Sequence, residues 1–144
     1  MTPDAMKELY RRYIAEVWIA HRPETMEQFF TADHLDLDAP PGQAQGLEEL
    51  RRIIKHFQAA FPDCTVAIDD LFVDGETLIA LITFSGTHHG VFFDIPPTGR
   101  AVRVGQIHVL RFRDGKFAVH RGKSDDLLML RQIGVIPEMA PAPH

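Results

Sequence analysis

Apolar residues recur at intervals of three and four near the start of the chain, at Met6, Leu9, Tyr10, Tyr13, Ile14, Val17 and Trp18. This spacing places them on one stripe of a helix, so it predicts a long amphipathic α-helix with that stripe facing a core. Thr2 and Pro3 are suited to its N-cap and first turn. A short second helix is expected at about 24–30.

A third helix is predicted from Leu47 to about Ala60, where Pro62-Asp63 ends it. Its apolar side carries Leu47, Leu50, Ile54, Phe57 and Phe61. The preceding segment, residues 33–46, is rich in Asp, Pro and Gly. We expect it to be irregular or only briefly extended.

The second half of the chain changes to the short runs that favour β-strands, at 66–73, 77–87, 102–112 and 117–121. Asp74-Gly75 and Asp114-Gly115 are hairpin signals. A last helix is predicted at 125–133, with Gly134 as its stop. Helices followed by antiparallel hairpins are typical of the α+β class.

The 144 residues suit one domain, so we interpret 1–144 as a single unit. Its Pro- and Ala-rich end, 137–144, is expected to be a frayed tail. Hydrophobic residues make up 45% of the chain, enough for a packed core. The net charge of −5, without a dense basic run, argues against nucleic acid as a partner.

The single cysteine, Cys64, excludes an intrachain disulfide and is expected to be buried. The first residues lack a basic region followed by an apolar stretch, and no apolar run approaches the ~20 residues that cross a bilayer. We therefore expect a cytoplasmic protein that does not bind a membrane.

Strand alternation at 102–112 puts six residues on the mostly apolar face: Val102, Val104, Gln106, His108, Leu110 and Phe112. That face should be the inner one, so the side chains of Gln106 and His108 should also point to the interior. Two readings of His108 stay open. It is a core histidine bonded to a neighbour, or a pocket residue that binds or polarises a substrate carbonyl.

The last predicted strand offers His120 and Arg121. Alternation puts His120 on one face with Gly122 and puts Arg121 on the other, although strand ends often bulge. Histidine is suited to proton transfer near neutral pH, and arginine could hold an anionic enolate or carboxylate. Edge packing for His120 and a surface salt bridge for Arg121 are the alternatives.

Asp36 and Asp38 form another candidate group, because their spacing puts both on one side of an extended segment. One of them could enter the mouth of a pocket, where desolvation would raise its pKa and suit it to act as a general base. The alternative is a pair of solvated loop residues. His34 is expected to point to water.

Other chemical signals are weaker. His88-His89 lack a third ligand at useful spacing, so no metal site is predicted. Asp125-Asp126 are better explained as a helix cap than as catalytic residues. The sequence has no Gly-rich phosphate loop, nucleophile elbow or Cys/His pair at a recognisable spacing, so no cofactor is predicted.

Three motifs carry a family resemblance: Gly86-Thr87-His88-x-Gly90, Pro96-Pro97-Thr98-Gly99-Arg100 and Leu130-x-Gln132-x-Gly134-Val135. With them the chain, from about Tyr10 to Pro137, resembles the SnoaL-like polyketide cyclases, also called ester cyclases. The resemblance implies a cone-shaped α+β barrel, the fold of nuclear-transport-factor-like proteins, in which N-terminal helices and a curved antiparallel sheet enclose a pocket.

In a cone of this kind the first helix lines the cavity. Tyr13 and Trp18 of that helix are therefore expected to contact substrate, and Phe57 of the third helix and Gln106 of the inner strand face are the other two expected contacts. Core packing is the alternative for the two aromatic residues of the first helix.

Family members that close polyketide rings do so by intramolecular aldol condensation, without metal or cofactor, using a carboxylic acid in the cavity. In them an Asp directly follows a His-Trp pair on the last strand. Here that stretch reads His120-Arg121-Gly122, so Gly122 takes the place of the acid. A histidine on the preceding strand corresponds to His108, and a His-x-Asp-like segment corresponds to Asp36-Leu37-Asp38, which keeps only Asp38.

The resemblance thus implies a metal-free, cofactor-free enzyme of isomerase or lyase type acting on a hydrophobic, polyketide-like small molecule. We expect Asp38 or His120 to move the proton, and His108 or Arg121 to stabilise developing negative charge. The alternatives are a cofactor-independent hydroxylase-like member and a non-catalytic module that binds a hydrophobic ligand. A homodimer or homotetramer is expected, paired through outer-face residues such as Ile107 and Val109.

Overall fold

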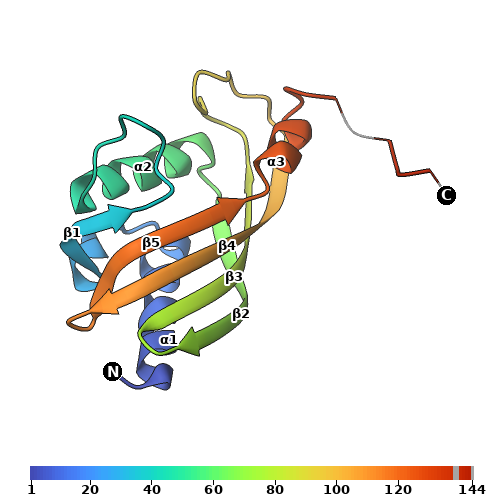
Figure 1. Cartoon of the computed structure of the whole chain (residues 1–144). Coiled ribbons are helices and arrows are strands. Elements are labelled where there is room, and N and C mark those ends of the chain that lie inside the picture. Colours follow the sequence, from blue (N-terminus) through green and yellow to red (C-terminus); the bar gives the residue numbers. More distant parts are fainter. Residues whose placement is uncertain (138–139, 144) are drawn as a thin grey trace.

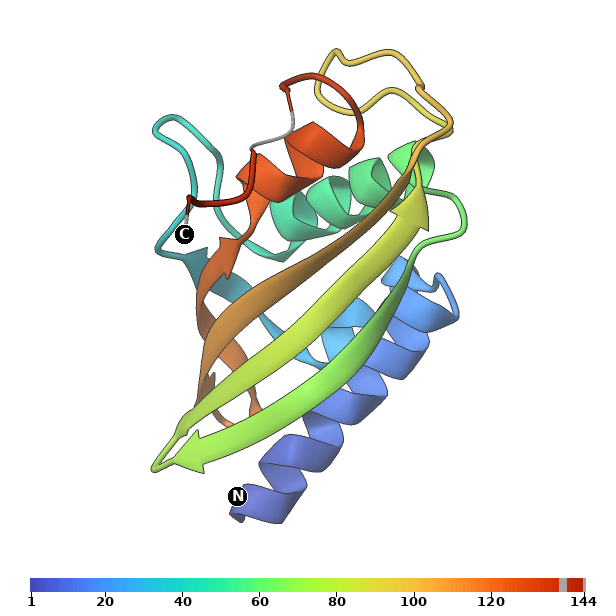
Figure 2. The ribbon, with the colours of Figure 1, turned by 90° about the vertical axis from the view of Figure 1, so that its right-hand side faces the viewer.

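One curved five-stranded sheet organises the fold, with α1 and α2 both lying on its inner face (Figures 1 and 2). The computed structural model describes residues 1–137 and 140–143. In chain order the elements are α1 (Pro3–Tyr13), the π-helix η1 (Ile14–Ile19), the 3₁₀-helix η2 (Pro23–Gln28), β1 (Phe30–Asp36), α2 (Leu47–Ala60), β2 (Thr65–Asp74), β3 (Thr77–Thr87), β4 (Ala101–Arg113), β5 (Lys116–Ser124) and α3 (Asp126–Gln132).

The strands lie in the order β1-β5-β4-β3-β2. Strands β2 to β5 pair antiparallel, and β1 joins β5 in parallel. The predicted α+β class is confirmed, but the sheet does not close into a barrel. It stays open because β1 and β2 each pair on one side only, so the helices rather than further strands complete the enclosure.

The first helix differs from the single α-helix that its apolar stripe predicted. It is α-helical to Tyr13 and π-helical from Ile14 to Ile19. A π-helical turn brings residues five apart together, and here the indole N–H of Trp18 donates to the hydroxyl of Tyr13 at 2.8 Å. The N-cap prediction is confirmed, since the Thr2 hydroxyl accepts from the backbone N–H of Ala5.

The segment after η2 is more ordered than its Asp-rich composition indicated. Residues Phe30–Asp36 form β1, and Asp36 lies in register beside His120 of β5. The side chain of Gln45 forms two hydrogen bonds with the free edge of this strand. Its oxygen accepts from Asp36 N–H at 2.8 Å, and its amide donates to the Asp36 carbonyl at 2.9 Å. Gln45 therefore replaces a missing neighbouring strand at this position.

Strand β5 runs three residues beyond its predicted end, to Ser124. The extension places Gly122 opposite His108 of β4, so the last strand contributes a second row of residues to the inner face. A bulge between Arg111 and Phe112 lies near the start of the strand pair. It follows that His108, His120 and Gly122 all belong to one patch of the inner surface.

The helix predicted at about 24–30 is a 3₁₀-helix over Pro23–Gln28, and Phe30 belongs to β1 instead. The predictions for the other two helices agree with the structure. Helix α2 has its expected bounds, and the Asp125 carboxylate caps α3 by accepting from Leu128 N–H. Gly134 has φ of +84°, as a helix stop requires. Of the tail predicted at 137–144, residues 138, 139 and 144 lie outside the described part; the others form no helix or strand. None of the described helices is long and apolar enough to span a membrane.

Candidate active site

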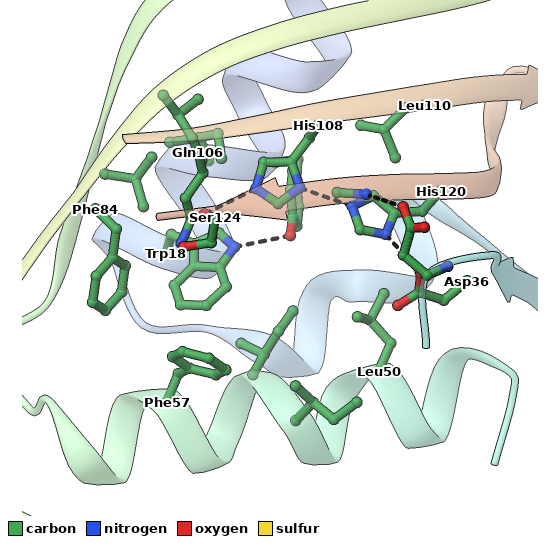
Figure 3. A pocket seen from close by; sticks show the side chains of 18 of the residues that line it. Trp18, Asp36, Leu50, Phe57, Phe84, Gln106, His108, Leu110, His120 and Ser124 are labelled. Atoms are coloured by element: carbon green, nitrogen blue, oxygen red, sulfur yellow. Dashed lines mark hydrogen bonds and ion pairs between the residues drawn. The ribbon is translucent and has the colours of Figure 1, made fainter. Parts of the chain in front are cut away.

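A cavity of about 280 Å³ lies between the inner face of the sheet and the helices. Its wall is mainly apolar, formed by side chains of α1, η1, α2, β3 and β4 that include Ile14, Leu50, Ile54, Ile82, Phe84 and Leu110. Polar groups gather on one side of it, where β4, β5 and β1 meet (Figure 3). Such a cavity suits a largely apolar ligand that is oriented by a few polar contacts.

Four side chains on that side form a continuous hydrogen-bonded row, which we call the relay (Figure 3). Asp36 Oδ1 lies 3.3 Å from His120 Nδ1, and His120 Nε2 lies 2.7 Å from His108 Nδ1. His108 Nε2 lies 2.9 Å from Gln106 Oε1. The imidazole rings of His108 and His120 are stacked at 5.0 Å between centroids. The relay therefore links a carboxylate to the interior of the cavity through two imidazoles.

The environment of each side chain in the relay determines whether that side chain is charged. Burial, and next the positive charge of His120 when that ring is protonated, lower the pKa of His108 to about 3. The hydrogen bond from His120 lowers the pKa of Asp36, which keeps the carboxylate ionised. A proton is consequently unstable on His108, while the negative charge of the relay lies on Asp36, next to His120.

Asp38 also lines the cavity, but its carboxylate is engaged elsewhere. Its Oδ2 accepts from the backbone N–H of Gly122 at 3.0 Å, and its Oδ1 lies 3.4 Å from Lys123 Nζ. Asp38 thus fastens the loop after β1 to β5. Of the two carboxylates that the sequence offered, the one directed at a histidine is Asp36.

The aromatic residues expected to contact substrate all line the cavity. Tyr13 and Trp18 come from the first helix, and Phe57 comes from α2. Trp18 and Phe57 pack edge to face at 6.4 Å. Tyr13 accepts the Trp18 hydrogen bond, which leaves its own O–H as a donor at the cavity wall.

The sequence profile of the SnoaL-like polyketide cyclases matches residues 7–133, most of the chain. The chain belongs to the SnoaL-like polyketide cyclase family. Because this match spans both the helices and the whole sheet, it covers every residue of the relay.

Among curated relatives, nogalonic acid methyl ester cyclase of Streptomyces nogalater is 25% identical over 116 residues, covering 78% of this chain and 86% of the relative. TsrD of Streptomyces laurentii has a similar structure, with a TM-score of 0.87 and 27% identity over 94% of this chain and 99% of that one. AclR of Streptomyces galilaeus, a hydroxylase candidate, has a TM-score of 0.84 and 22% identity over 97% and 87% of the two chains. The last likeness concerns the fold alone.

Within this SnoaL-like fold, Arg121 does not reach the cavity. It lies between His120 and Gly122 on β5, so alternation directs its side chain to the outer face, where it is exposed and opposite Val109. Its expected role in stabilising substrate charge therefore has no geometric support, and we leave it out of the proposed catalytic set.

His34 was expected to point to water, and this is wrong. The side chain is only 2% exposed and lines the cavity, packed edge to face on Phe30 at 4.9 Å. Within the described residues neither ring nitrogen meets a partner at hydrogen-bonding geometry, and burial lowers the pKa of His34 to about 4. A neutral imidazole held in this way can offer one donor and one acceptor to a bound molecule.

His34 was expected to point to water, and Asp36 was a candidate that gave way to Asp38 in the expected catalytic set, yet the two share a detectable signal. With Phe30 they fall at even spacings, so one face of a strand carries all three into the cavity. Moving the family's His-x-Asp segment two residues toward the N-terminus gives His34-Leu35-Asp36, which retains both its residue types.

His88, considered for a metal site, belongs to a different part of the core. It is fully buried, and its Nδ1 lies 3.0 Å from the Thr98 hydroxyl. Within residues 1–137 and 140–143, no three His, Cys, Asp or Glu side chains are gathered as metal ligands.

Proposed function

We propose that the protein is an acid/base enzyme that moves a proton on a hydrophobic, polyketide-like carbonyl compound, as in an intramolecular aldol ring closure. The observation that carries the proposal is the relay from Asp36 to His108 inside an apolar cavity. The family supports a small-molecule substrate of this class. The step uses the side chains of this chain and the substrate itself.

In the base form of the relay both histidines are neutral. His120 Nδ1–H donates to Asp36, and His108 Nδ1–H donates to His120 Nε2, so the lone pair of His108 Nε2 faces the Gln106 amide, which the substrate displaces when it binds. This atom is the imidazole nitrogen of the relay that lies farthest along it from the Asp36 carboxylate. We assign it as the atom that takes the acidic C–H proton of the substrate, which leaves an enolate.

The proton taken at His108 Nε2 does not leave its charge there. As it binds, the Nδ1 proton of His108 passes to His120 Nε2, and the positive charge comes to lie on His120 beside the Asp36 carboxylate. This explains how an imidazole with a pKa of about 3 could act as a base, because the cation forms on its neighbour.

The second half of the reaction returns the proton. The enolate carbon attacks a carbonyl of the same molecule, a C–C bond forms, and the carbonyl oxygen becomes an alkoxide. His108 Nε2–H then protonates that oxygen while the relay shifts back, so one proton is taken and one is returned. Gln106 can follow both forms, because turning its amide presents either oxygen or N–H to His108 Nε2.

Product formation tests this proposal. Purified protein would be incubated with nogalonic acid methyl ester, the compound in the relative's name, and with a panel of aromatic β-dicarbonyl esters, and products would be followed by liquid chromatography and mass spectrometry. We expect ring-closed product from at least one compound. His120→Gln should lower the rate by about 10²–10⁴-fold, the usual contribution of acid/base catalysis.

Arg121→Gln is the matched control, since it changes the neighbouring residue of β5 on the outer face. It should keep the wild-type rate. Equal rates for wild type and His120→Gln would refute the proposal. A protein that binds these esters without converting any of them would support the hydrophobic-ligand-binding module instead.

Cytoplasmic location, absence of a cofactor and assembly into a homodimer or homotetramer remain predictions from the sequence. For assembly, the structure leaves Ile107 exposed at 48% on the outer face of β4, next to the half-buried Val109. Light scattering of the purified protein measures the oligomer directly.

A further inference from the structure

The relay is packed against a residue that has no side chain. Gly122 lies opposite His108 in the pairing of β4 with β5, and two residues beyond His120 on the same face of β5. A Cβ placed on Gly122 would lie 2.9 Å from both Cε1 and Nε2 of His120 and 3.1 Å from Nδ1 of His108. These are the three atoms at and beside the contact between the two imidazoles.

The backbone does not explain the glycine. Gly122 is not among the residues with positive φ, so any L-residue could adopt its conformation. Its N–H donates to Asp38, a bond that any residue except proline can make. A larger residue at 122 would instead fill the space on the inner face of β5 that the His120 ring now occupies.

From these contacts we infer that Gly122 is a positioning residue, whose missing side chain makes the space that holds His120 against His108 and so keeps the relay continuous. The effect of Gly122 on catalysis rests on the proposed function, whereas its effect on the position of His120 does not. Any side chain at 122 would push the His120 ring into the cavity. The ring borders empty space and can move, whereas the closely packed sheet on the other side of residue 122 cannot.

Gly122→Ala tests the inference, with Gly105→Ala as the matched control. Gly105 is also a glycine of the central sheet without positive φ, but nothing lies within 4 Å of a Cβ placed on it. Both changes therefore add the same methyl group to a strand. Only the first adds it beside the relay.

The first readout is the imidazole N–H proton shared by His120 Nε2 and His108 Nδ1, observed by NMR of protein labelled with ¹⁵N-histidine. His108→Gln and His120→Gln identify the signal among the eight histidines. We expect the signal in wild type and in Gly105→Ala, and its loss or a large shift in Gly122→Ala. An unchanged signal in Gly122→Ala would overturn the inference.

The second readout is a double-mutant cycle on stability, which stays informative even if Gly122→Ala folds poorly. Without the His120 ring the two contacts of 2.9 Å disappear and only the contact of 3.1 Å with His108 Nδ1 remains, so Gly122→Ala should destabilise wild type clearly more than a His120→Ala background. Equal destabilisation in both backgrounds would show that the methyl group meets something other than His120, and would also overturn the inference.

Turnover separates the inference from the proposed function. Gly122→Ala should be as slow as His120→Gln, and combining the two changes should produce no further loss. If the NMR signal disappears while turnover stays at the wild-type rate, Gly122 does position His120 but the relay does not carry the reaction. That result would contradict the proposed function and leave the spacing role of Gly122 standing.

Discussion

At the scale of single residues, the choice between two carboxylates shows what the structure adds. Asp36 and Asp38 are alike in the sequence, where both stand on one side of an extended segment. In the fold Asp36 contacts His120, whereas Asp38 accepts from the Gly122 backbone and pairs with Lys123. Asp36 is therefore placed beside a residue suited to proton transfer, whereas Asp38 is placed to hold the backbone together.

Replacing each carboxylate by its amide distinguishes these roles. Asp36→Asn removes the negative charge that stabilises a protonated His120, so the turnover number should fall by about 10²-fold or more, with a smaller change in KM. Asp38→Asn keeps an oxygen for the Gly122 N–H and should retain most of the turnover. Steady-state kinetics of the two variants provide the measurement, and a larger loss for Asp38→Asn would reverse the assignment.

The inner position of His108 could be predicted from the sequence, because β4 alternates regularly and its apolar residues define the inner face. The partner of His108 could not. The distance between two imidazoles on adjacent strands depends on the register of β4 against β5 and on the lack of a side chain at Gly122. Neither is visible in the local pattern around either histidine.

At the scale of elements, the long regular segments were predictable and the irregular ones were not. The bounds of α2 and β3 follow from sustained periodicity and clear stop signals. Strand β1 was anticipated only as a brief extended stretch within residues 33–46, because most of the residues after Thr31 have weak β-propensity and the order of the strand comes from pairing with β5, far along the chain. The π-helical turn was missed since its apolar spacing fits an α-helix equally well.

Because β1 is an edge strand, its end depends on Gln45. The Gln45 side chain binds the backbone N–H and carbonyl of Asp36, so it keeps the carboxylate at the level of His120. We expect Gln45→Ala to speed hydrogen exchange at the amides of Asp36 and Leu37 and to lower turnover. Exchange followed by NMR or mass spectrometry tests this, and unaltered protection at both amides would contradict it.

The comparable backbone amides inside β4 provide the internal reference for that experiment. They are paired on both sides, to β3 and to β5, so the loss of Gln45 should not reach them. An acceleration confined to the end of β1 would show a local effect on the edge strand, and a general acceleration would show global destabilisation instead.

At the scale of the whole molecule, a cavity that holds neutral histidines makes stability depend on pH. The folded pKa of His108, about 3, and that of His34, about 4, both lie below the ordinary value of 6.5. Between these values the unfolded chain binds protons that the folded protein does not. The free energy of unfolding therefore falls as the pH drops below about 6.5, and is fully recovered above it.

Urea unfolding at a series of pH values from 7 to 5 measures this dependence. One proton contributes a slope of up to about 1.4 kcal/mol per pH unit, so His108→Gln should lower the slope by about that amount. The range lies above the one in which Asp36, whose pKa is lowered, would begin to take up a proton. Identical slopes for wild type and His108→Gln would show that His108 titrates normally in the folded protein.

The central claim is that the row of side chains from Asp36 through His120 to His108 takes a proton from a carbon acid bound in the cavity. The most direct measurement is the rate at which the acidic C–H of a bound β-dicarbonyl ester exchanges with deuterium oxide, because this isolates proton abstraction from ring closure. We expect wild type to exchange the proton far faster than buffer alone, and His120→Gln to return the rate close to that of buffer. Equal exchange by wild type and His120→Gln would contradict the claim.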